Sequence, residues 1–468
     1  MKTSCISILS LMILLFACKK ESFNTSKDAQ VIITADSLHY DTVFTTTGSI
    51  TQSFKIINEN DQKLKIDKVK LMGGTISSFK INVDGFVGPE VNNLEIEAND
   101  SLYVFVSVVI DANAGNLPFV IRDSIQVIYN GNEEFVQLEA WGQNAHFYRN
   151  KKVTATETWV NDLPYVILGS LIVDTTATLI INKSCRIYTH ADAPWIIDGS
   201  LKVNGEKDTI DRVYFSGDRL DEPYKDFPAG WPGIYFRTVS KDNVLNYAVI
   251  KNAYQALALE NLPPNANPKL TLNQCIIDNA YDAGIISVNS SISAVNCLVS
   301  DCGKNLYLVK GGNYQFTHCT VASYSNNFIQ HKDPVLLVSD FIRINNVPVI
   351  ANLDALFRNC IFWGENGLVD DEVVVTKGGA TVFKVTFDQV LWKVKNNPAN
   401  IVITPPAPIN NQPPQFDSIN TSKHYYDFRL QATSPAKNTG SDAGITIDLD
   451  GKPRPVGLPD LGAYERQN

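Results

Sequence analysis

The chain has 468 residues, of which 44% are hydrophobic and 19% are charged. This balance is ordinary for a folded protein and excludes a disordered chain, and the length allows two or three domains. The formal net charge of −9 supplies no basic field for phosphates, so we expect no nucleic acid among the partners.

The N-terminus has the layout of an export signal. Lys2 precedes an apolar run, 6–16, that is too short to span a bilayer permanently. The run ends in Leu15-Phe16-Ala17-Cys18, which resembles the bacterial lipobox. The resemblance implies a lipoprotein signal peptide at 1–17 and lipidation of Cys18. A plain signal peptide with an incidental cysteine is the alternative.

The polar stretch at 18–30 reads as a tether. Together with the lipobox resemblance, it implies an exported protein anchored to the bacterial cell envelope. The outer membrane is the expected membrane. Several acyl chains on one cysteine would form a firm anchor, because each buried CH₂ contributes about 0.8 kcal/mol.

Residues 31–146 contain short alternating segments at turn-like spacing, for example at 53–58, 79–83 and 102–106. Such spacing indicates a β-sandwich. A Phe-x-Ile-x-Asn segment, then Ser-Ser-Phe-x-Ile, then a strand ending in Trp141-Gly142-Gln143 resembles immunoglobulin-like modules of the ASH/MSP type. Such modules space domains or bind partners, so the resemblance implies no chemistry here.

From residue 147 to 396 the pattern becomes repetitive. Cys275, Cys297 and Cys319 recur at intervals of 22 residues (297 − 275 and 319 − 297), with apolar residues stacked at the same offset on either side. A period near 22 suits one coil of a parallel β-helix. The region resembles right-handed parallel β-helix proteins of the pectin-lyase-like superfamily. The fold class is therefore expected to be all-β, a sandwich followed by a β-helix.

The cysteine column favours inward-facing small side chains. A disulfide from Cys297 or Cys302 to a neighbour stays open, because an exported setting permits oxidation. The column resumes at Cys360, and the 41-residue interval (360 − 319) leaves space for one irregular intervening coil. No Cys-x-x-Cys pair or Cys/His cluster with zinc spacing is present.

Residues 397–468 are predicted to form a linker and a C-terminal cap. The linker is Pro-rich. Beyond it, Ser434-Pro435, Asp450-Gly451, Pro453-Arg454-Pro455 and Asp460 to Glu465 resemble the ending of surface β-helix proteins that carry a choice-of-anchor Q domain. We expect this region to cover the last coil, because an exposed solenoid end has unpaired strand edges.

The loop at 217–233 is the place where carboxylates, a guanidinium and aromatic rings crowd together. Sugars bind to aromatic faces flanked by polar groups, and calcium binds to several carboxylates on a bent loop. A corner loop plugged by its tryptophan is the structural alternative. The candidate ligand-binding or catalytic residues are Asp218, Arg219, Asp221, Asp226 and Trp231, and Asp218, Asp221 and Asp226 are also the candidates for binding calcium.

A β-eliminating lyase would need a base beside a carboxylate neutraliser. His318 precedes an inward cysteine and so is expected to face outward, while His190 and His331 sit near coil corners. Each is interpreted as an ordinary surface residue. No pattern resembling the pectate-lyase calcium site is found, and no cofactor other than calcium is suggested.

These features predict a membrane-anchored lipoprotein whose β-helix binds a polysaccharide or another envelope component without catalysis. Two alternatives remain. One is a polysaccharide lyase or glycoside hydrolase that uses carboxylates on the coil face, and the other is a structural adhesin or spacer. A shared fold hosts many functions, so this step rests on analogy.

Overall fold

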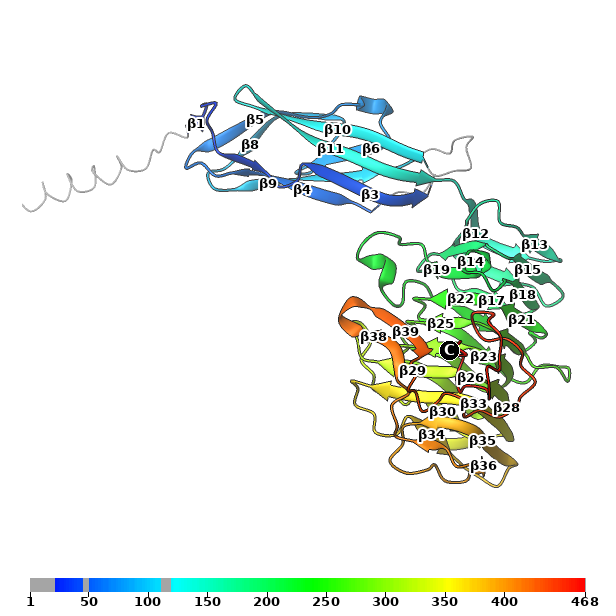
Figure 1. The fold of residues 1–468 in the computed structure, drawn as a ribbon. Helices are drawn as coiled ribbons and strands as arrows, with labels where there is room; N and C mark the ends of the chain where they lie inside the picture. Colours follow the sequence, from blue (N-terminus) through cyan, green and yellow to red (C-terminus); the bar gives the residue numbers. More distant parts are fainter. Residues whose placement is uncertain (1–21, 45–49, 111–118, 468) are drawn as a thin grey trace, which may run out of the picture. The chain divides into compact units, whose positions relative to one another are not determined.

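The computed structural model describes residues 22–44, 50–110 and 119–467, so the predicted signal peptide and Cys18 lie outside the described residues. The chain divides into two compact units, residues 1–144 and 145–468, called here the sandwich unit and the coiled unit. Both are built from strands (Figure 1), with short 3-10 turns η1 (Gly74–Ile76), η2 (Thr209–Asp211), η3 (Tyr224–Asp226) and η4 (Thr421–Lys423). No helix in these ranges is long and apolar enough to cross a membrane.

The sandwich unit consists of two sheets around one hydrophobic core, as the alternating segments predicted. That core contains no cysteine. Fully buried side chains such as Ile56, Leu64 and Val104 hold the sheets together. One sheet comprises β1 (Phe23–Asn24), β5 (Lys63–Leu71), β10 (Phe119–Tyr129), β11 (Asn132–Gln143), β3 (Ser37–Phe44) and β8 (Glu90–Ile96). The other comprises β2 (Val31–Ile33), β4 (Gln52–Asn58), β9 (Ser101–Val108), β6 (Phe79–Val83) and β7 (Phe86–Val87).

The coiled unit contains a 24-stranded parallel sheet in which each strand pairs with the strand one coil later. Consecutive strands cycle through three faces. The strands of the first face are β16 (Arg186–Thr189), β19 (Val213–Gly217), β22 (Ala248–Lys251), β25 (Ile276–Asp278), β27 (Leu298–Ser300), β29 (Thr320–Tyr324) and β37 (Ile409–Asn410), and the first halves of β12 (His146–Val153) and β14 (Tyr165–Val173) precede them.

The second face takes the later halves of β12 and β14, followed by β17 (Trp195–Ile197), β20 (Ile234–Phe236), β23 (Gln255–Glu260), the first halves of β26 (Ala283–Val295) and β28 (Lys304–Thr317), β30 (Leu336–Ser339) and β34 (Val373–Thr376). The third face takes β13 (Glu157–Trp159), β15 (Thr178–Asn182), β18 (Ser200–Asn204), β21 (Asn243–Asn246), β24 (Leu270–Asn273), the later halves of β26 and β28, and β36 (Val402–Thr404). Two long strands, β33 (Leu353–Glu365) and β35 (Phe383–Trp392), run from the third face into the first.

The cysteine column lies inside the coil. Residues on either side of Cys275 pair with those flanking Cys297, and the same holds between Cys297 and Cys319. The described cysteines, Cys302 included, are buried and free, and burial raises the pKa of the Cys297 thiol well above its usual range. The structure therefore selects stacked free thiols over a disulfide.

The residue before each cysteine of the column turns the corner between the third and first faces. Gln274, Asn296, His318 and Asn359 all have φ between 50° and 54°. This left-handed conformation is rare outside glycine, and Asn and His adopt it more readily than most residues. One residue per corner suffices, so the strands on both sides keep their register.

The predicted intervening coil between Cys319 and Cys360 is wrong. Thr317 pairs with Arg358 and Thr320 pairs with Ile361, so the two cysteines belong to adjacent coils. The extra residues belong to a single enlarged coil, where the hairpin of β31 (Phe341–Ile344) and β32 (Val347–Ile350) follows β30.

The prediction of a linker and end cap at 397–468 needs two corrections. Strands β36 and β37 pair with β35, so the parallel sheet extends to Asn410. The remaining segment, residues 412–467, is called here the strap; it begins with the hairpin of β38 (Phe416–Asn420) and β39 (Tyr425–Leu430). In Figure 1 the orange hairpin and red tail lie beside the middle coils. The strap therefore covers the side of the coil.

Apolar side chains explain this position. The outward residues Leu298, Ala322 and Ile361 of the first face form one buried cluster with Leu449 and Leu461 of the strap, together with their neighbours. Burying apolar surface contributes about 25 cal/mol per Å². The first face would expose these side chains to water if the strap lay on the end of the coil.

Polar contacts fix the strap in place. The corner residue Asn296 donates from Nδ2 to the Ile447 carbonyl (2.7 Å) and accepts from Arg454 Nη1 (2.6 Å). Arg454 Nε also donates to Glu465 Oε2 at 2.9 Å, and both side chains are fully buried. The row of corner residues before the cysteines therefore also binds the strap, through Asn296.

Candidate functional site

Charged side chains of the loop at 217–233 pair with groups in the loop and beside it. Arg219 donates from Nε and Nη2 to the two carboxylate oxygens of Asp221 at 2.7 and 2.9 Å. Its guanidinium lies 4.0 Å from the centre of the Tyr224 ring. His190 Nδ1 lies 2.7 Å from Asp218 Oδ2. These groups are occupied with one another.

The other two predicted residues of this loop lie apart from that group. Trp231 is 1% exposed, and its Nε1 donates to the Lys251 carbonyl at 2.8 Å. It plugs the coil corner and presents no ring face to a sugar. Asp226 is exposed, and its backbone carbonyl accepts from Asn279 Nδ2 at 2.9 Å.

The five predicted residues therefore do not converge on one ligand. Within the described ranges, no group of three or more His, Cys, Asp or Glu side chains is placed to hold a metal ion, so Asp218, Asp221 and Asp226 do not form a calcium cluster there. The loop is a folded corner with a buried tryptophan.

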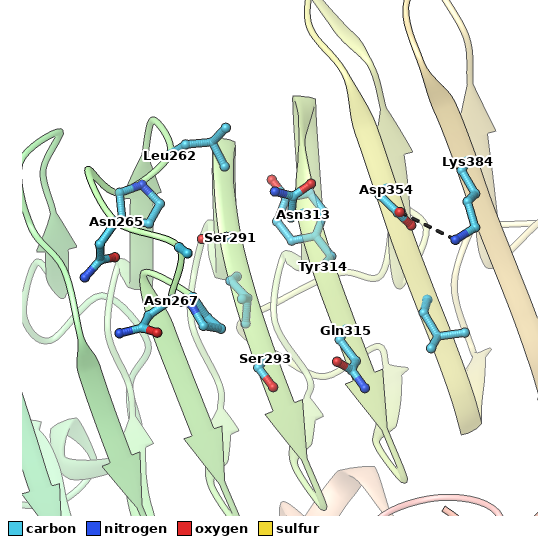
Figure 2. Close-up of a pocket in the computed structure, with 15 residues that line it drawn as sticks. Leu262, Asn265, Asn267, Ser291, Ser293, Asn313, Tyr314, Gln315, Asp354 and Lys384 are labelled. Atoms are coloured by element: carbon cyan, nitrogen blue, oxygen red, sulfur yellow. Dashed lines mark ion pairs between the residues drawn. The ribbon is translucent and has the colours of Figure 1, made fainter.

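A groove of about 520 Å³ lies instead on the third face. Figure 2 shows its floor, formed by strands of adjacent coils, and its wall, formed by the loop after β23. The loop contributes Leu262, Asn265 and Asn267, and the floor contributes side chains from β26, β28, β33 and β35. The sequence pattern alone did not predict this groove.

Strand register arranges the floor in two columns. In the first column, Ser291 pairs with Asn313, Asn313 with Asp354, and Asp354 with Lys384. Adjacent coils lie about 4.8 Å apart. Polar side chains therefore recur at a fixed interval along the groove.

The second column lies two residues further along the same strands. Ser293 pairs with Gln315, and Gln315 pairs with Leu356. Together the columns offer hydroxyl, amide, carboxylate and ammonium groups around an aliphatic side chain. This mixture suits a ligand that has many hydroxyls and some apolar surface.

The wall of the groove is held by one carboxylate. Asp242 accepts from Asn265 Nδ2 at 3.0 Å and from Asn267 Nδ2 at 2.7 Å. The hydrogen bond from Asn267 is the largest influence on the pKa of Asp242, and it lowers that pKa together with the bond from Asn265. The loop is thus preorganised at neutral pH by a charged acceptor.

The charged groups of the floor pair with each other. Lys384 Nζ lies 3.5 Å from Asp354 Oδ2, as the dashed line in Figure 2 marks, and their side chains are 61% and 54% exposed. Solvent screens such a pair strongly. These groups can donate to and accept from a ligand without a large desolvation cost.

Two histidines differ from their predicted surface positions. His318 points outward from the coil but is 1% exposed, because the strap lies over it; its Nδ1 is 3.2 Å from the Asp460 carbonyl. His331 is 1% exposed, and its Nε2 lies 2.8 Å from Oε1 of the buried Glu372. Both predictions were wrong because distant segments cover these side chains.

The groove left a partial signal in the sequence. The Pro/Asn insertion at 261–265 indicates a loop that projects from a corner of the coil. On the strands beside it, Asn and Ser alternate with apolar residues. Its far side comes from Asp354 and Lys384. Their register depends on the enlarged coil, which the 22-residue period does not reveal.

No protein-family model matches the chain, and no curated protein resembles it significantly. Among solved structures, a family 123 glycoside hydrolase from Clostridium perfringens matches at 13% identity over 26% of this chain and 26% of that chain, with a TM-score of 0.19. The ASH/PapD-like domain of human CEP192 matches at 12% identity over 27% of this chain and 92% of that domain, with a TM-score of 0.18. The Salmonella enterica SafA pilin in complex with the SafB chaperone matches at 12% identity, 26% and 57% coverage and a TM-score of 0.17.

Proposed function

We propose that the protein is an exported lipoprotein of the bacterial cell envelope that binds a neutral polysaccharide in the groove of the third face without cleaving it. In this proposal the coiled unit is a right-handed parallel β-helix of the pectin-lyase-like type. The sandwich unit is an ASH/MSP-type module that acts as a spacer, and lipidation of Cys18 anchors the chain to the outer membrane.

The repeated polar floor of the groove is the observation that supports binding. A polysaccharide that lies along the stack of coils meets a new pair of side chains at each coil. Asn313 and Gln315 come from β28, one of the two inner strands among the four of the floor, so both would contact the ligand. Amide groups both donate and accept, which suits the hydroxyl groups of a sugar.

Charge favours a neutral ligand. The chain has a formal net charge of −9, and the lysine that lines the groove is paired with Asp354. An acidic glycan would be repelled by the overall field and would have to compete for Lys384. A neutral glycan meets neither cost.

The lining also favours binding over hydrolysis. A glycosidase uses two carboxyl groups about 5 to 9.5 Å apart. Among the residues that line the groove, Asp354 is the one carboxylate, and it is already paired. This arrangement supports a site that recognises a chain and leaves its bonds intact.

The test uses the soluble chain that begins at position 18 and carries Cys18→Ser. It is screened against neutral and acidic polysaccharides by affinity electrophoresis, and the supernatant is assayed for new reducing or unsaturated ends. We expect retention by a neutral polysaccharide and no new ends. New ends would replace the proposal with an enzyme, and no retention by any glycan would replace it with a structural spacer.

A further inference from the structure

Lys269 is buried at the end of the loop that forms the wall of the groove. It follows Pro268, which lines the groove, and it precedes β24. Its own side chain is 0% exposed and is not part of the groove lining. Burying an ammonium costs free energy, and an apolar side chain would fill the same space without that cost. The positive charge at this position therefore needs an explanation other than packing.

Three backbone carbonyls bind the ammonium. Lys269 Nζ donates to the carbonyls of Arg237 at 2.9 Å, Thr238 at 3.0 Å and Glu260 at 2.6 Å. Three acceptors are the full capacity of an ammonium group. Burial lowers the pKa of Lys269 to about 8, and the negative charge of Glu260 opposes this shift. At pH 7 the group therefore keeps its proton and all three donors.

These contacts connect both ends of the wall to the preceding coil. The wall loop, residues 261–268, leaves the sheet after Glu260 and returns at Lys269. Arg237 and Thr238 follow β20, which pairs with β23 of the next coil. Because the Lys269 side chain is fully buried, water could replace it only if the loop opened. The closed position of the loop therefore depends on this side chain.

The backbone of Lys269 connects the wall to the floor. Its amide donates to Ser291 Oγ at 2.9 Å, and Ser291 lines the groove. Its carbonyl accepts from Asn243 Nδ2 at 2.8 Å, and Asn243 is also fully buried. The same residue thus fixes the base of the wall relative to a floor side chain.

The tip of the wall loop is held separately. Asp242 accepts from Asn265 and Asn267, and Asp242 belongs to the same connecting segment, 237–242, that supplies two carbonyls to Lys269. The loop is therefore held at its base by a buried cation and at its tip by an anion. A wall fixed at both points lowers the conformational cost of binding a ligand.

We propose that Lys269 is a positioning residue of the groove, whose buried ammonium holds the wall loop in the conformation that binds the polysaccharide. This inference rests on the proposed glycan binding and adds to it a residue that the ligand does not touch. Three hydrogen bonds to defined carbonyls fix the direction of the side chain as well as its place. An apolar side chain in the core could not do this.

The first test compares Lys269→Met with the wild type, both as the soluble Cys18→Ser chain. Methionine has a similar length and no donors, so the loop should open at its base. In the wild type the amides of Asn261 and Lys269 donate to the Val288 carbonyl and to Ser291 Oγ. Hydrogen exchange at positions 261 and 269 should become at least about tenfold faster without ligand, and the dissociation constant for the neutral polysaccharide should rise at least about tenfold.

Lys251→Met is the matched control. Lys251 pairs with Asp278 on the first face and is partly exposed, so exchange at the loop base and glycan affinity should both stay unchanged. Unchanged exchange in Lys269→Met would overturn the inference while leaving glycan binding intact. Faster exchange with unchanged affinity would make Lys269 a structural residue and would also overturn it. A wild type that binds no polysaccharide would overturn the proposed function and this inference with it.

The second test uses the wild type alone, so it does not depend on how well Lys269→Met folds. Lysines are acetylated with succinimidyl acetate, and the rate at each lysine is followed by mass spectrometry. A buried amine reacts only when its surroundings open, so Lys269 should react more slowly than Lys251. A polysaccharide at about ten times its dissociation constant should slow Lys269 about tenfold and leave Lys251 unchanged. Equal rates at the two lysines, or no slowing by a bound polysaccharide, would refute the positioning role.

Discussion

The first and third faces of the coil are built from the same kind of parallel strand ladder, but they differ in whether another part of the chain covers them. In the middle coils of the first face, outward side chains such as Leu298, Ala322 and Ile361 are apolar, and the strap buries them. In the groove of the third face, the outward side chains are mostly polar, and Asn313 and Gln315 remain exposed to a ligand. Stability is thus concentrated where the chain covers itself, and recognition is expected where it does not.

The largest effect should come from breaking the cover of the first face. Replacing Arg454 by Met leaves Glu465 buried without its partner, which costs about 3 to 5 kcal/mol. Urea denaturation should show this loss, and limited proteolysis should cut the strap first. Arg429→Met is the control, because its ion pairs are partly exposed and should contribute less than about 1 kcal/mol. Equal losses in both variants would contradict a special role for the buried Arg454–Glu465 pair.

Acid should loosen the same face. Burial, with a smaller contribution from Arg454, lowers the pKa of His318 to about 3, against roughly 6.5 in an unfolded chain. The unfolded state then binds more protons between these values, so stability falls as pH falls from about 6.5 towards 3. The expected loss near pH 4 is about 3 kcal/mol.

His318→Gln isolates this effect from its neighbours. Burial raises the pKa of Asp448 and of Asp460, so these groups favour the folded state as pH falls and oppose the histidine. Because the two carboxyl groups are present in both proteins, their effect cancels in the comparison. As pH falls from 7 to 4, the unfolding free energy of wild type should therefore fall relative to that of His318→Gln. A constant difference would show that His318 does not titrate on unfolding.

Substitutions in the groove of the third face should weaken ligand binding and leave the free energy of unfolding unchanged. Asn313→Ala and Gln315→Ala each remove a hydrogen-bonding group from the floor, so the dissociation constant for the bound polysaccharide should rise about tenfold. Asn204→Ala is a matched change on the same face outside the groove and should bind normally. Affinities are measured by calorimetry with an oligosaccharide. Unchanged binding in both groove variants would place the ligand elsewhere.

The smallest effect is expected in the loop at 217–233. Arg219→Ala breaks a partly exposed ion pair with Asp221. The free energy of unfolding, measured by thermal denaturation, should therefore change by less than about 1 kcal/mol. Glycan affinity should be unaffected. A large loss of affinity would indicate that this loop, and not the groove, binds the ligand.

The sequence predicts the coil well, because inward residues are periodic. The 22-residue spacing of Cys275, Cys297 and Cys319 reflects direct stacking, and Trp231 is buried as a corner plug. These features depend on contacts between neighbouring coils, so a short-range pattern is enough to reveal them.

The strap and the groove depend on contacts that no short-range pattern contains. His318 does point outward, but a segment about 140 residues away covers it. Likewise, Asp354 reaches the groove because an enlarged coil shifts its pairing to Asn313. A crowded charged loop is conspicuous in a sequence, yet Arg219 and Asp221 satisfy each other.

Hydrogen–deuterium exchange of the soluble chain with and without a bound neutral polysaccharide tests the central claim most directly. The account predicts that protection appears at 262–268 and in the third-face parts of β26, β28 and β33, with none at 217–233. Protection confined to the loop at 217–233 or to the second face would contradict it.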